Sequence, residues 1–214
     1  MAISITEKEN KEQWSIDGGI EIALDFDFIN SNSIVMDIGG YRGFWSNEMA
    51  KRYSPHKLFV FEPVWEFCQQ CNDLLGRYKF AKVLPFGLGA YSRVQSIGIM
   101  NDSTSIFLEC TQHKSAIQII RINDAMNSLG IDYSDLTAIN IEGMEYELLE
   151  YLLLTGYIKQ HRALLIQFHD MENKYGLSGY QERMRNIRKS LAKTHRCVYS
   201  YKYVFELWRE EISK

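Results

Sequence analysis

The sequence is short of several features that would place it in other classes of protein. No apolar stretch approaches the roughly 20 residues of a membrane-spanning helix. The charged N-terminal segment also lacks the apolar core of a signal peptide. The four cysteines suggest no disulfide framework, so we expect a reducing, cytoplasmic compartment. With a net charge of −3 and no basic run, the chain is not expected to bind a nucleic-acid backbone.

Proline is rare as well, and no linker, repeat or low-complexity segment divides the chain. Hydrophobic residues make up 46% and charged residues 24%, which is the balance of an ordinary globular protein. A chain of 214 residues is long enough to bury a proper core as one α/β domain. We therefore expect residues 1–214 to form a single domain, with the oligomeric state left open.

Strand patterns alternate with helix patterns along the chain, which predicts an α/β fold with a mostly parallel sheet. The predicted core strands are Ser33–Ile38, Lys57–Phe61, Ala81–Phe86, Leu136–Ile141 and Arg162–Phe168, with a further strand at Ile117–Ile122, and the closing antiparallel strands are Cys197–Tyr201 and Val204–Arg209. The predicted helices are Ile20–Phe28, Gly43–Tyr53, Trp65–Tyr78, Asp124–Leu129, Glu145–Leu154 and Tyr180–Lys193. A loop is expected at Gly87–Ser92, and a hairpin at Gln95–Met100 and Ser105–Cys110.

The segment Ser33–Phe44, SIVMDIGGYRGF, carries the strongest functional signal. Asp37 ends a buried strand, and Gly39, Gly40 and Gly43 then allow a sharp turn against which a ligand can lie. In an open α/β sheet this strand end is where ligands bind. The spacing differs from the G-x-G-x-x-G of dinucleotide sites, and a carboxylate here would repel a pyrophosphate. It would suit a cationic ligand such as S-adenosylmethionine, which carries an ammonium and a sulfonium.

The second strand adds a carboxylate of its own. Lys57–Phe61 is a continuous apolar run, typical of a strand buried on both faces, and it ends at Glu62. Glu62 follows Asp37 by 25 residues, about where a βαβ unit places the carboxylate that binds ribose hydroxyls. Pro63 and Val64 would then cover one face of the adenine. A solvated glutamate at a strand end is the alternative, and the combination with Asp37 favours the ligand site.

Polar residues also follow the later core strands. Asn140 and Glu142 share one face of their strand, so Glu142 is expected to point into the same crevice, whereas Glu145 falls in the first turn of the next helix. His169 and Asp170 end the following strand. A histidine there is a suitable general base because its pKa lies near neutrality, and Glu142 or Asp170 would orient it. Glu145 would contact the substrate or, alternatively, only stabilise the helix start; His169 has a structural alternative too.

No metal site is predicted. The carboxylates and the histidine could hold a hard divalent cation, but no ligand spacing supports one. A structural zinc at Cys68-Gln69-Gln70-Cys71 would need two more ligands with similar spacing, and Cys110 and Cys197 are isolated. We interpret the C-x-x-C pair as helix packing.

Five segments in this order, VMDIGGYRG, VFEP, FGLGAYS, INIEGMEYELL and QFHD, resemble the FkbM family of S-adenosylmethionine-dependent methyltransferases. The resemblance covers roughly Ile34–Asp170, and VFELW near the C-terminus fits the last strand of the family. It implies a Rossmann-like class I methyltransferase fold, with a mostly parallel sheet, antiparallel closing strands and helices on both faces. It also implies O-methylation, often of sugar hydroxyls in glycans or glycosylated metabolites.

Carried over by motif, Asp37, Gly39 and Gly43 belong to the loop on the methionine side of the cofactor, and Glu62 binds the ribose. The full set of expected cofactor contacts is Asp37, Gly39, Gly40, Tyr41, Gly43, Glu62, Pro63 and Val64. The chain departs from the family where Tyr41 replaces the usual asparagine and where Ala138-Ile139-Asn140 replaces the usual K-I-D. The second departure removes charges that would contact a substrate or a metal.

We therefore expect an S-adenosylmethionine-dependent O-methyltransferase that acts on a sugar or glycan, with His169, Glu142, Asp170 and Glu145 as candidate catalytic residues. Two alternatives remain at this point. A nicotinamide-dependent oxidoreductase is one, although the glycine spacing argues against it. A non-catalytic Rossmann-like binding domain of a larger glycan-assembly protein is the other.

Overall fold

The computed structural model describes residues 7–100, 103–105 and 114–211. The strands are β1 (Ile34–Ile38), β2 (Lys57–Phe61), β3 (Ala81–Leu84), β4 (Gly87–Gly89), β5 (Arg93–Met100), β6 (Ser103–Ser105), β7 (Lys114–Arg121), β8 (Leu136–Ile139), β9 (Ala163–Ile166), β10 (His195–Tyr201) and β11 (Phe205–Glu210). The helices are α1 (Glu7–Ile16), α2 (Phe44–Tyr53), α3 (Trp65–Leu75), α4 (Ile122–Leu129), α5 (Glu145–Thr155), α6 (Met171–Tyr175) and α7 (Tyr180–Leu191), with 3₁₀ turns η1 (Gly19–Glu21) and η2 (Tyr157–Gln160).

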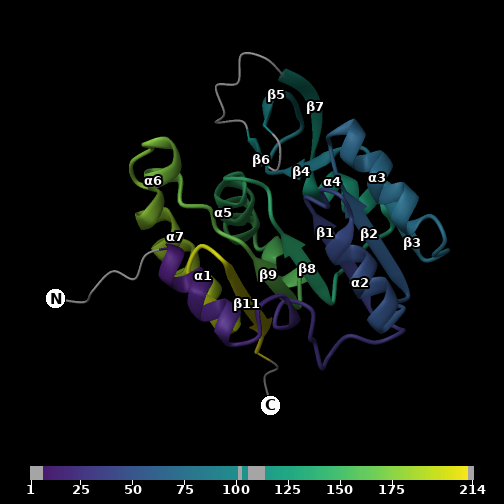
Figure 1. The fold of residues 1–214 in the computed structure, drawn as a ribbon, viewed down its shortest axis with the longest axis horizontal. Helices are drawn as coiled ribbons and strands as arrows, with labels where there is room; N and C mark the ends of the chain where they lie inside the picture. Colours follow the sequence, from purple (N-terminus) through teal and green to yellow (C-terminus); the bar gives the residue numbers. More distant parts are fainter. Residues whose placement is uncertain (1–6, 101–102, 106–113, 212–214) are drawn as a thin grey trace.

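Within these residues the strands form a main sheet of seven and a small sheet of four (Figure 1). The main sheet has the order β10-β11-β9-β8-β1-β2-β3, and β11 runs in the opposite direction to the other six strands. The small sheet has the order β4-β7-β5-β6 and stands beside the upper ends of β1 and β2 in Figure 1. The predicted α/β class, with a mostly parallel sheet and antiparallel closing strands, is confirmed.

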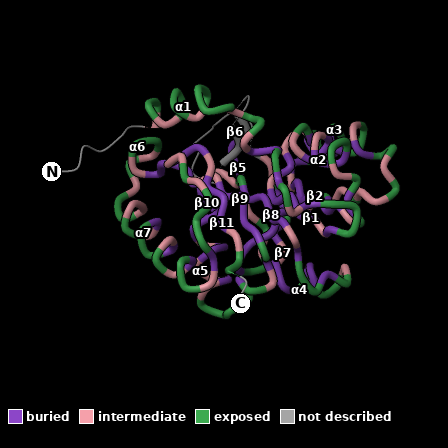
Figure 2. Tube along the Cα trace, turned by 90° about the horizontal axis from the view of Figure 1, so that it is seen from below, coloured by how far each residue is buried: buried purple, intermediate pink, exposed green. Residues whose placement is uncertain are grey.

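The central strands are buried on both faces because helices cover both sides of the main sheet (Figure 2). Alternate residues of β1 point to opposite faces. Met36 and Ile38 pack into the core beneath α4, α5 and α7, whereas Val35 packs into the core beneath α2 and α3. This two-sided burial explains why the strands read as continuous apolar runs in the sequence.

The N-terminal part of the chain departs from the prediction. The helix predicted at Ile20–Phe28 is wrong: the structure has only the short turn η1, followed by turns. Gly18 and Gly19 have φ values of 129° and 56°, which lie outside the helical region. The segment packs Ala23, Leu24 and Phe26 against the α2 side of the sheet instead. Helix α1 was not predicted, and none of its residues is buried.

The region between β3 and α4 forms the small sheet. The loop expected at Gly87–Ser92 begins with a strand instead, because β4 pairs in parallel with Ile119–Arg121 of β7. An antiparallel hairpin forms where predicted, between β5 and β6, but β6 begins at Ser103, two residues before the predicted second strand. Its predicted second strand continues to Cys110, and residues 106–110 lie outside the described part of the chain. Strand β7 also pairs antiparallel with β5 and so joins the hairpin to β4.

Candidate functional site

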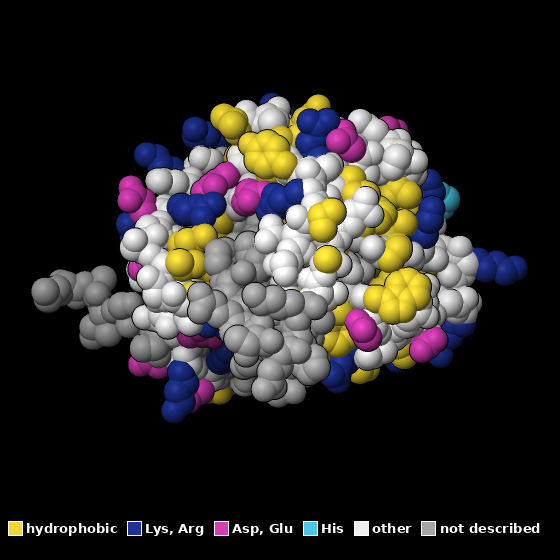
Figure 3. Space-filling model, turned by 90° about the horizontal axis from the view of Figure 1, so that it is seen from above, with side chains coloured by type: hydrophobic (Ala, Val, Ile, Leu, Met, Phe, Trp, Pro, Cys, Tyr) yellow, Lys and Arg dark blue, Asp and Glu magenta, His cyan; other side chains and the backbone are white. Residues whose placement is uncertain are grey.

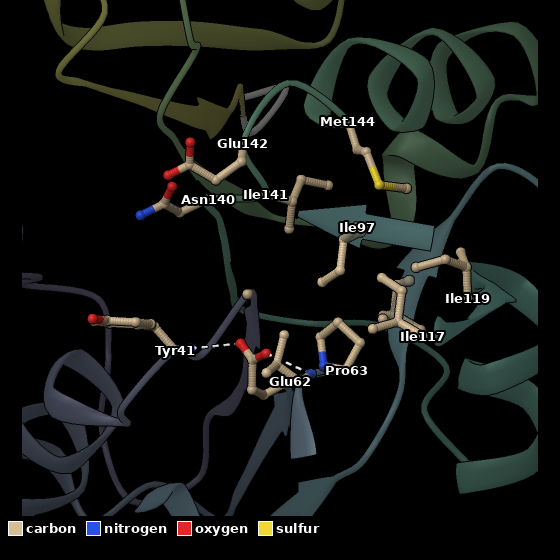
Figure 4. A pocket seen from close by; sticks show the side chains of 14 residues that line it. Tyr41, Glu62, Pro63, Ile97, Ile117, Ile119, Asn140, Ile141, Glu142 and Met144 are labelled. Atoms are coloured by element: carbon tan, nitrogen blue, oxygen red, sulfur yellow. Dashed lines mark hydrogen bonds between the residues drawn. The ribbon is translucent and has the colours of Figure 1, made fainter. Parts of the chain in front are cut away.

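Two adjoining cavities lie at the carboxyl ends of β1, β2 and β8. The first is bounded by Glu62, Pro63 and Val64 on one side and by Ile97, Ile117 and Ile119 of the small sheet on the other (Figure 4). The second is lined by Asp37, Gly40, Ile20, Phe44 and Trp45 among others. Gly39, Tyr41 and Asn140 line both cavities, so one elongated ligand could span them.

The turn after β1 requires glycine at two positions. Gly39 has a φ of 91°, and a Cβ on it would lie 2.0 Å from the carbonyl oxygen of Asn140. Gly43 has a φ of 79°, and its Cβ would lie 3.1 Å from Cα of Cys71. The glycines therefore let the tip of β1 touch β8 and let the start of α2 touch α3.

Tyr41 occupies the turn between these glycines and separates the two cavities. Its φ of 49° is left-handed, which is strained for a residue with a side chain. Its backbone N–H donates to Glu62 Oε2 at 2.8 Å, and its carbonyl accepts a hydrogen bond from Cys71 Sγ at 3.0 Å. The ring packs edge-on against Phe67 at 4.5 Å between centroids. These contacts hold the strained backbone in place.

Glu62 is a buried carboxylate, 5% exposed, at the edge of the first cavity. Its oxygens accept hydrogen bonds from the backbone N–H groups of Val64 and Tyr41, each at 2.8 Å. Burial raises the pKa of Glu62 to about 7, although these two hydrogen bonds oppose the change. A ligand that donates hydrogen bonds to this carboxylate would favour its charged form.

Asp37 has the same character in the second cavity. It is 5% exposed, and its Oδ2 accepts a hydrogen bond from Ser46 Oγ at 2.6 Å. Burial raises its pKa to about 6, with the Ser46 hydrogen bond opposing. Over the described ranges, no Lys, Arg or His side chain forms an ion pair with Asp37 or Glu62. Each carboxylate is therefore buried without the cation that would compensate it.

The structure thus brings together the residues predicted to hold the cofactor. Seven of the eight line one or both cavities, namely Asp37, Gly39, Gly40, Tyr41, Glu62, Pro63 and Val64. Gly43 lines neither and instead allows α2 to pack on Cys71. The isoleucine side chains that line the first cavity opposite Pro63 were not predicted from the sequence. The alternation of Ile117 and Ile119 along β7 was the available signal, since residues two apart share one face of a strand.

Glu142 lies at the edge of the first cavity, where its side chain lies next to that of Asn140 (Figure 4). It has a left-handed φ of 53°. Oε1 lies 3.3 Å from His169 Nε2, and Oε2 accepts a hydrogen bond from Lys174 Nζ at 3.0 Å. Burial raises the pKa of Glu142, but the hydrogen bond and charge of His169 and the charge of Lys174 outweigh it and lower the pKa. Glu142 is therefore ionised at neutral pH.

His169 lies behind Glu142 and is not among the residues that line either cavity. Its Nδ1 lies 3.0 Å from Oε1 of the buried Glu145, and its Nε2 faces Glu142. Burial lowers the pKa of His169, but the charge of Glu145 and the hydrogen bonds to both carboxylates outweigh it and raise the pKa to about 10. Both imidazole nitrogens face carboxylates, and neither lines a cavity. This geometry does not support the predicted role of His169 as the general base.

Glu145 and Asp170 also differ from their predicted roles. Glu145 is 0% exposed, and it accepts hydrogen bonds from the backbone N–H groups of Gly143 and His169, both at 2.8 Å. It lines neither cavity, and its Oε1 contacts both the backbone N–H and Nδ1 of His169. Asp170 caps α6, where its oxygens accept hydrogen bonds from Asn173 N at 3.1 Å and Asn173 Nδ2 at 2.6 Å. Sequence reasoning also missed Lys174, on the unpredicted helix α6.

Other features of the described ranges limit what the site can be. They contain no group of three or more His, Cys, Asp or Glu side chains arranged to hold a metal ion. Cys68 and Cys71 are buried in α3, as expected for helix packing. In the same ranges no helix is long and apolar enough to cross a membrane.

The face seen from above in Figure 3 carries mixed charges. Basic and acidic side chains are interspersed over it, and hydrophobic side chains gather on the right, the side of α2 and α3. Phe44 and Trp65, at the starts of these helices, are 62% and 61% exposed. Since Phe44 also lines the second cavity, this apolar surface borders the cavity mouth.

The fold is similar to those of solved methyltransferase structures. An rRNA methylase from Streptococcus thermophilus aligns with a TM-score of 0.55 and 10% identity, over 90% of this chain and 96% of that one. A fibrillarin/Nop5p complex aligns with a TM-score of 0.56 and 10% identity, over 92% and 81%. A putative methyltransferase from Streptococcus mutans in complex with SAH aligns with a TM-score of 0.51 and 10% identity, over 88% and 94%.

No family model and no curated protein matches the sequence. At 10% identity the structural likeness shows the fold, which is the Rossmann-like fold of S-adenosylmethionine-dependent methyltransferases. The FkbM family is not confirmed, and the activity has to be argued from the site.

Proposed function

We propose that this protein binds S-adenosylmethionine across the two cavities and transfers its methyl group to a hydroxyl. The observation that carries the proposal is the pair of buried, uncompensated carboxylates, Glu62 in the first cavity and Asp37 in the second. A ligand with ribose hydroxyls at one end and an ammonium at the other supplies what each carboxylate lacks.

The first cavity fits the adenosine end of this cofactor. Each carboxylate oxygen of Glu62 bonds one backbone N–H and can accept a further hydrogen bond from a ribose hydroxyl. Pro63 and Ile119 offer apolar surfaces for an adenine ring. Gly87 keeps this space open, because a Cβ there would lie 2.7 Å from Cδ1 of Ile119 and 3.4 Å from Cγ of Pro63.

The second cavity fits the methionine end. Asp37 offers its carboxylate to the ammonium, and the bare backbone of Gly39 and Gly40 lets a ligand approach closely. Tyr41 lines both cavities, so it would touch the cofactor between its two ends.

When bound, S-adenosylmethionine supplies a methyl carbon activated by the sulfonium. The chain has to align an acceptor hydroxyl with it and take the proton. Glu142 is the ionised group at the cavity edge that can accept this proton. Its lowered pKa is no obstacle, because a hydroxyl oxygen that gains a methyl group becomes a far stronger acid than a carboxylic acid.

His169 and Glu145 act as positioning residues in this scheme. The imidazolium of His169 bridges the two carboxylates, and Glu145 also binds the N–H of Gly143, next to the left-handed Glu142. This network fixes the strained turn that presents Glu142 to the cavity. Loss of His169 would therefore misplace Glu142 rather than remove the proton acceptor.

A sugar hydroxyl is the proposed acceptor, and its support is the resemblance of the sequence motifs to the FkbM family. The neighbouring amide of Asn140 and carboxylate of Glu142 agree with such an acceptor, since together they can donate to one hydroxyl and accept from another. Incubation of candidate glycans with protein and S-adenosylmethionine, followed by mass analysis, should reveal a methyl increment. If methyl groups appear only on acceptors without sugars, the sugar assignment fails.

Calorimetry tests the cofactor assignment. S-adenosylhomocysteine should bind the intact chain, and Glu62→Gln should weaken binding roughly ten- to hundred-fold, since a hydrogen bond to a charged group contributes about 1.5–3 kcal/mol. Glu66→Gln is the matched control, because Glu66 lies in the exposed first turn of α3 and lines neither cavity. Absence of binding, binding of NAD instead, or equal affinities in both variants would overturn the assignment.

A further inference from the structure

Cys71 lies directly beneath the turn that follows β1, although it is not part of the cofactor site itself. It is fully buried and lines neither cavity. Its Sγ donates a hydrogen bond to the carbonyl oxygen of Tyr41 at 3.0 Å. A Cβ at Gly40 would lie 3.6 Å from this sulfur, and a Cβ at Gly43 would lie 3.3 Å from it. The turn is therefore folded against a single thiol of α3.

Helix α3 holds Tyr41 at two points. Phe67 and Cys71 are four residues apart and so lie on the same face of this helix. Phe67 packs against the Tyr41 ring, at 4.5 Å between centroids, and Cys71 binds the carbonyl. On its other side the Tyr41 N–H is bound to Glu62, as Figure 4 shows. The left-handed backbone of Tyr41 persists only where its surroundings determine it, and α3 supplies both a ring contact and a hydrogen bond.

The chemistry of the Cys71 thiol suits this contact. Burial raises its pKa, and the charges of Asp37 and Glu62 act in the same direction. The thiol therefore keeps its proton at neutral pH and remains a donor. Cys68, the other member of the C-x-x-C pair, is buried as well, but its sulfur accepts a contact from Asn72 of the same helix at 3.7 Å. The two cysteines thus make different contacts, one within α3 and one to the turn.

We propose that Cys71 is a positioning residue for the cofactor, and that it acts through the Tyr41 carbonyl to fix the wall between the two cavities. The proposal rests on the function proposed above, because Tyr41 lines both cavities and would touch the cofactor between its two ends. Without the thiol, the turn would also adopt conformations in which Tyr41 leaves its left-handed state. A ligand that needs one conformation binds with an affinity reduced by the population of that conformation.

Calorimetry with S-adenosylhomocysteine tests this role in variants of the full chain. Cys71→Ala removes the donor and should weaken binding about tenfold, the scale of one lost hydrogen bond. Cys71→Ser keeps a donor of similar size and should bind within about threefold of the wild-type protein. Cys68→Ala is the matched control, because it removes a buried thiol from the same helix one turn away, and it should bind like the wild-type protein. Equal affinities in Cys71→Ala and Cys68→Ala, or no rescue by Cys71→Ser, would overturn the proposal.

Hydrogen exchange in the protein without ligand separates this proposal from the proposed function. The Tyr41 amide should exchange about tenfold faster in Cys71→Ala than in the wild-type protein or in Cys68→Ala, because the turn opens more often. Unchanged exchange, or faster exchange with unchanged affinity, would overturn the proposal. Failure of the wild-type protein to bind the ligand would instead overturn the proposed function, and faster exchange in Cys71→Ala would then still support control of the turn by Cys71.

A labelling experiment on the wild-type protein provides a test that needs no folded variant. Since Cys71 is fully buried, iodoacetamide should reach it only when the turn opens. Saturating S-adenosylhomocysteine should slow this reaction about tenfold or more, because the ligand binds the closed turn. The reaction of Cys68 on the same helix should be slowed less. Equal slowing at both cysteines would reveal only a general stabilisation of the fold and would contradict the proposal.

Discussion

The two halves of the site hold carboxylates in opposite ways. At the ends of β1 and β2, Asp37 and Glu62 are buried with no ion pair to a cationic side chain of the described residues, and burial raises the pKa of each. At the end of β8 and the start of α5, Glu142 and Glu145 share the His169 imidazolium. One pair is left for a ligand to compensate, whereas the other is compensated within the chain.

This difference separates binding from positioning. We call Asp37 and Glu62 the cofactor half of the site, and Glu142, Glu145 and His169 the acceptor half, after the roles proposed above. A buried carboxylate without a partner destabilises the fold, so a ligand that brings hydrogen-bond donors and a positive charge should bind favourably to the cofactor half. In the acceptor half the charges already satisfy one another and fix a strained turn, so its shape should exist before any ligand binds. Charge alone could not distinguish the two halves in the sequence, since both present two acidic residues at strand ends or helix starts.

The largest expected difference between the two halves should appear when Glu142 is neutralised. Glu142→Gln keeps the size of the side chain but removes the proton acceptor, so turnover should fall roughly 10²–10⁴-fold. Affinity for S-adenosylhomocysteine should stay nearly constant, because Glu142 belongs to the acceptor half. Single-turnover methyl transfer beside calorimetry measures both quantities. Near-normal transfer in the folded variant would remove Glu142 from the mechanism.

Removal of Glu145 tests how much the buried network of the acceptor half contributes to the free energy of unfolding. Glu145→Ala leaves His169 with one carboxylate and leaves two buried N–H groups unpaired, so we expect a loss of about 3–5 kcal/mol in the free energy of unfolding. Glu150→Ala, on the same helix but in a half-exposed pair with Arg183, should cost about 1 kcal/mol or less. Denaturant unfolding of both variants provides the measurement. Equal losses would show that the buried network adds nothing.

The cofactor half should respond to pH where the acceptor half does not. With pKa values raised to about 7 and about 6, Glu62 and Asp37 gain protons in the free protein as pH falls from 8 to 5.5. The ligand prefers their charged forms, so affinity for S-adenosylhomocysteine should fall about tenfold or more over this range. Calorimetry at several pH values measures this change. In Glu62→Gln the part of the decline centred near pH 7 should disappear, and a flat wild-type profile would contradict the assignment.

The smallest expected effect concerns metal. Asn140 lies where the FkbM family, which the sequence resembles, usually has an aspartate. A neutral amide is a weaker ligand for a hard cation than a carboxylate. Methyl transfer should therefore be unchanged by a chelator and need no added divalent ion. Turnover that is lost in chelator and restored by magnesium or manganese would require Glu142 to be reinterpreted as a ligand.

The central strands of the main sheet (β1, β2, β8 and β9) were predictable because each is buried on both faces. Strand β2 occupies Lys57–Phe61 as predicted, and a continuous apolar run leaves few other choices. The polar helix α1 was not predictable from periodicity, since it buries none of its side chains. Strand β4 was missed because the residues at Gly87–Gly89 owe their strand conformation to the distant β7. The local sequence preferences of these residues do not predict a pairing with a strand so distant in the chain.

The candidate site shows the same limit. The positions of Asp37 and Glu62 followed from the topology, because strand ends of a parallel sheet converge. The charge state of His169 did not, because it depends on a buried contact with Glu145, 24 residues earlier in the chain. A histidine beside an aspartate suggests a base in the sequence, whereas the packed structure shows that two other carboxylates face its ring and raise its pKa.

The contact between Gly39 and Asn140 bears on how this protein could be engineered. With a Cβ at Gly39 only 2.0 Å from the carbonyl oxygen of Asn140, the tip of β1 cannot be remodelled without displacing β8. The turn after β1 and the segment after β8, which leads from Asn140 to Glu142, are therefore packed too tightly to move independently. Efforts to change what binds beside Glu142 should leave this junction unchanged. They should vary α6, whose Lys174 contacts Glu142 without sharing that junction.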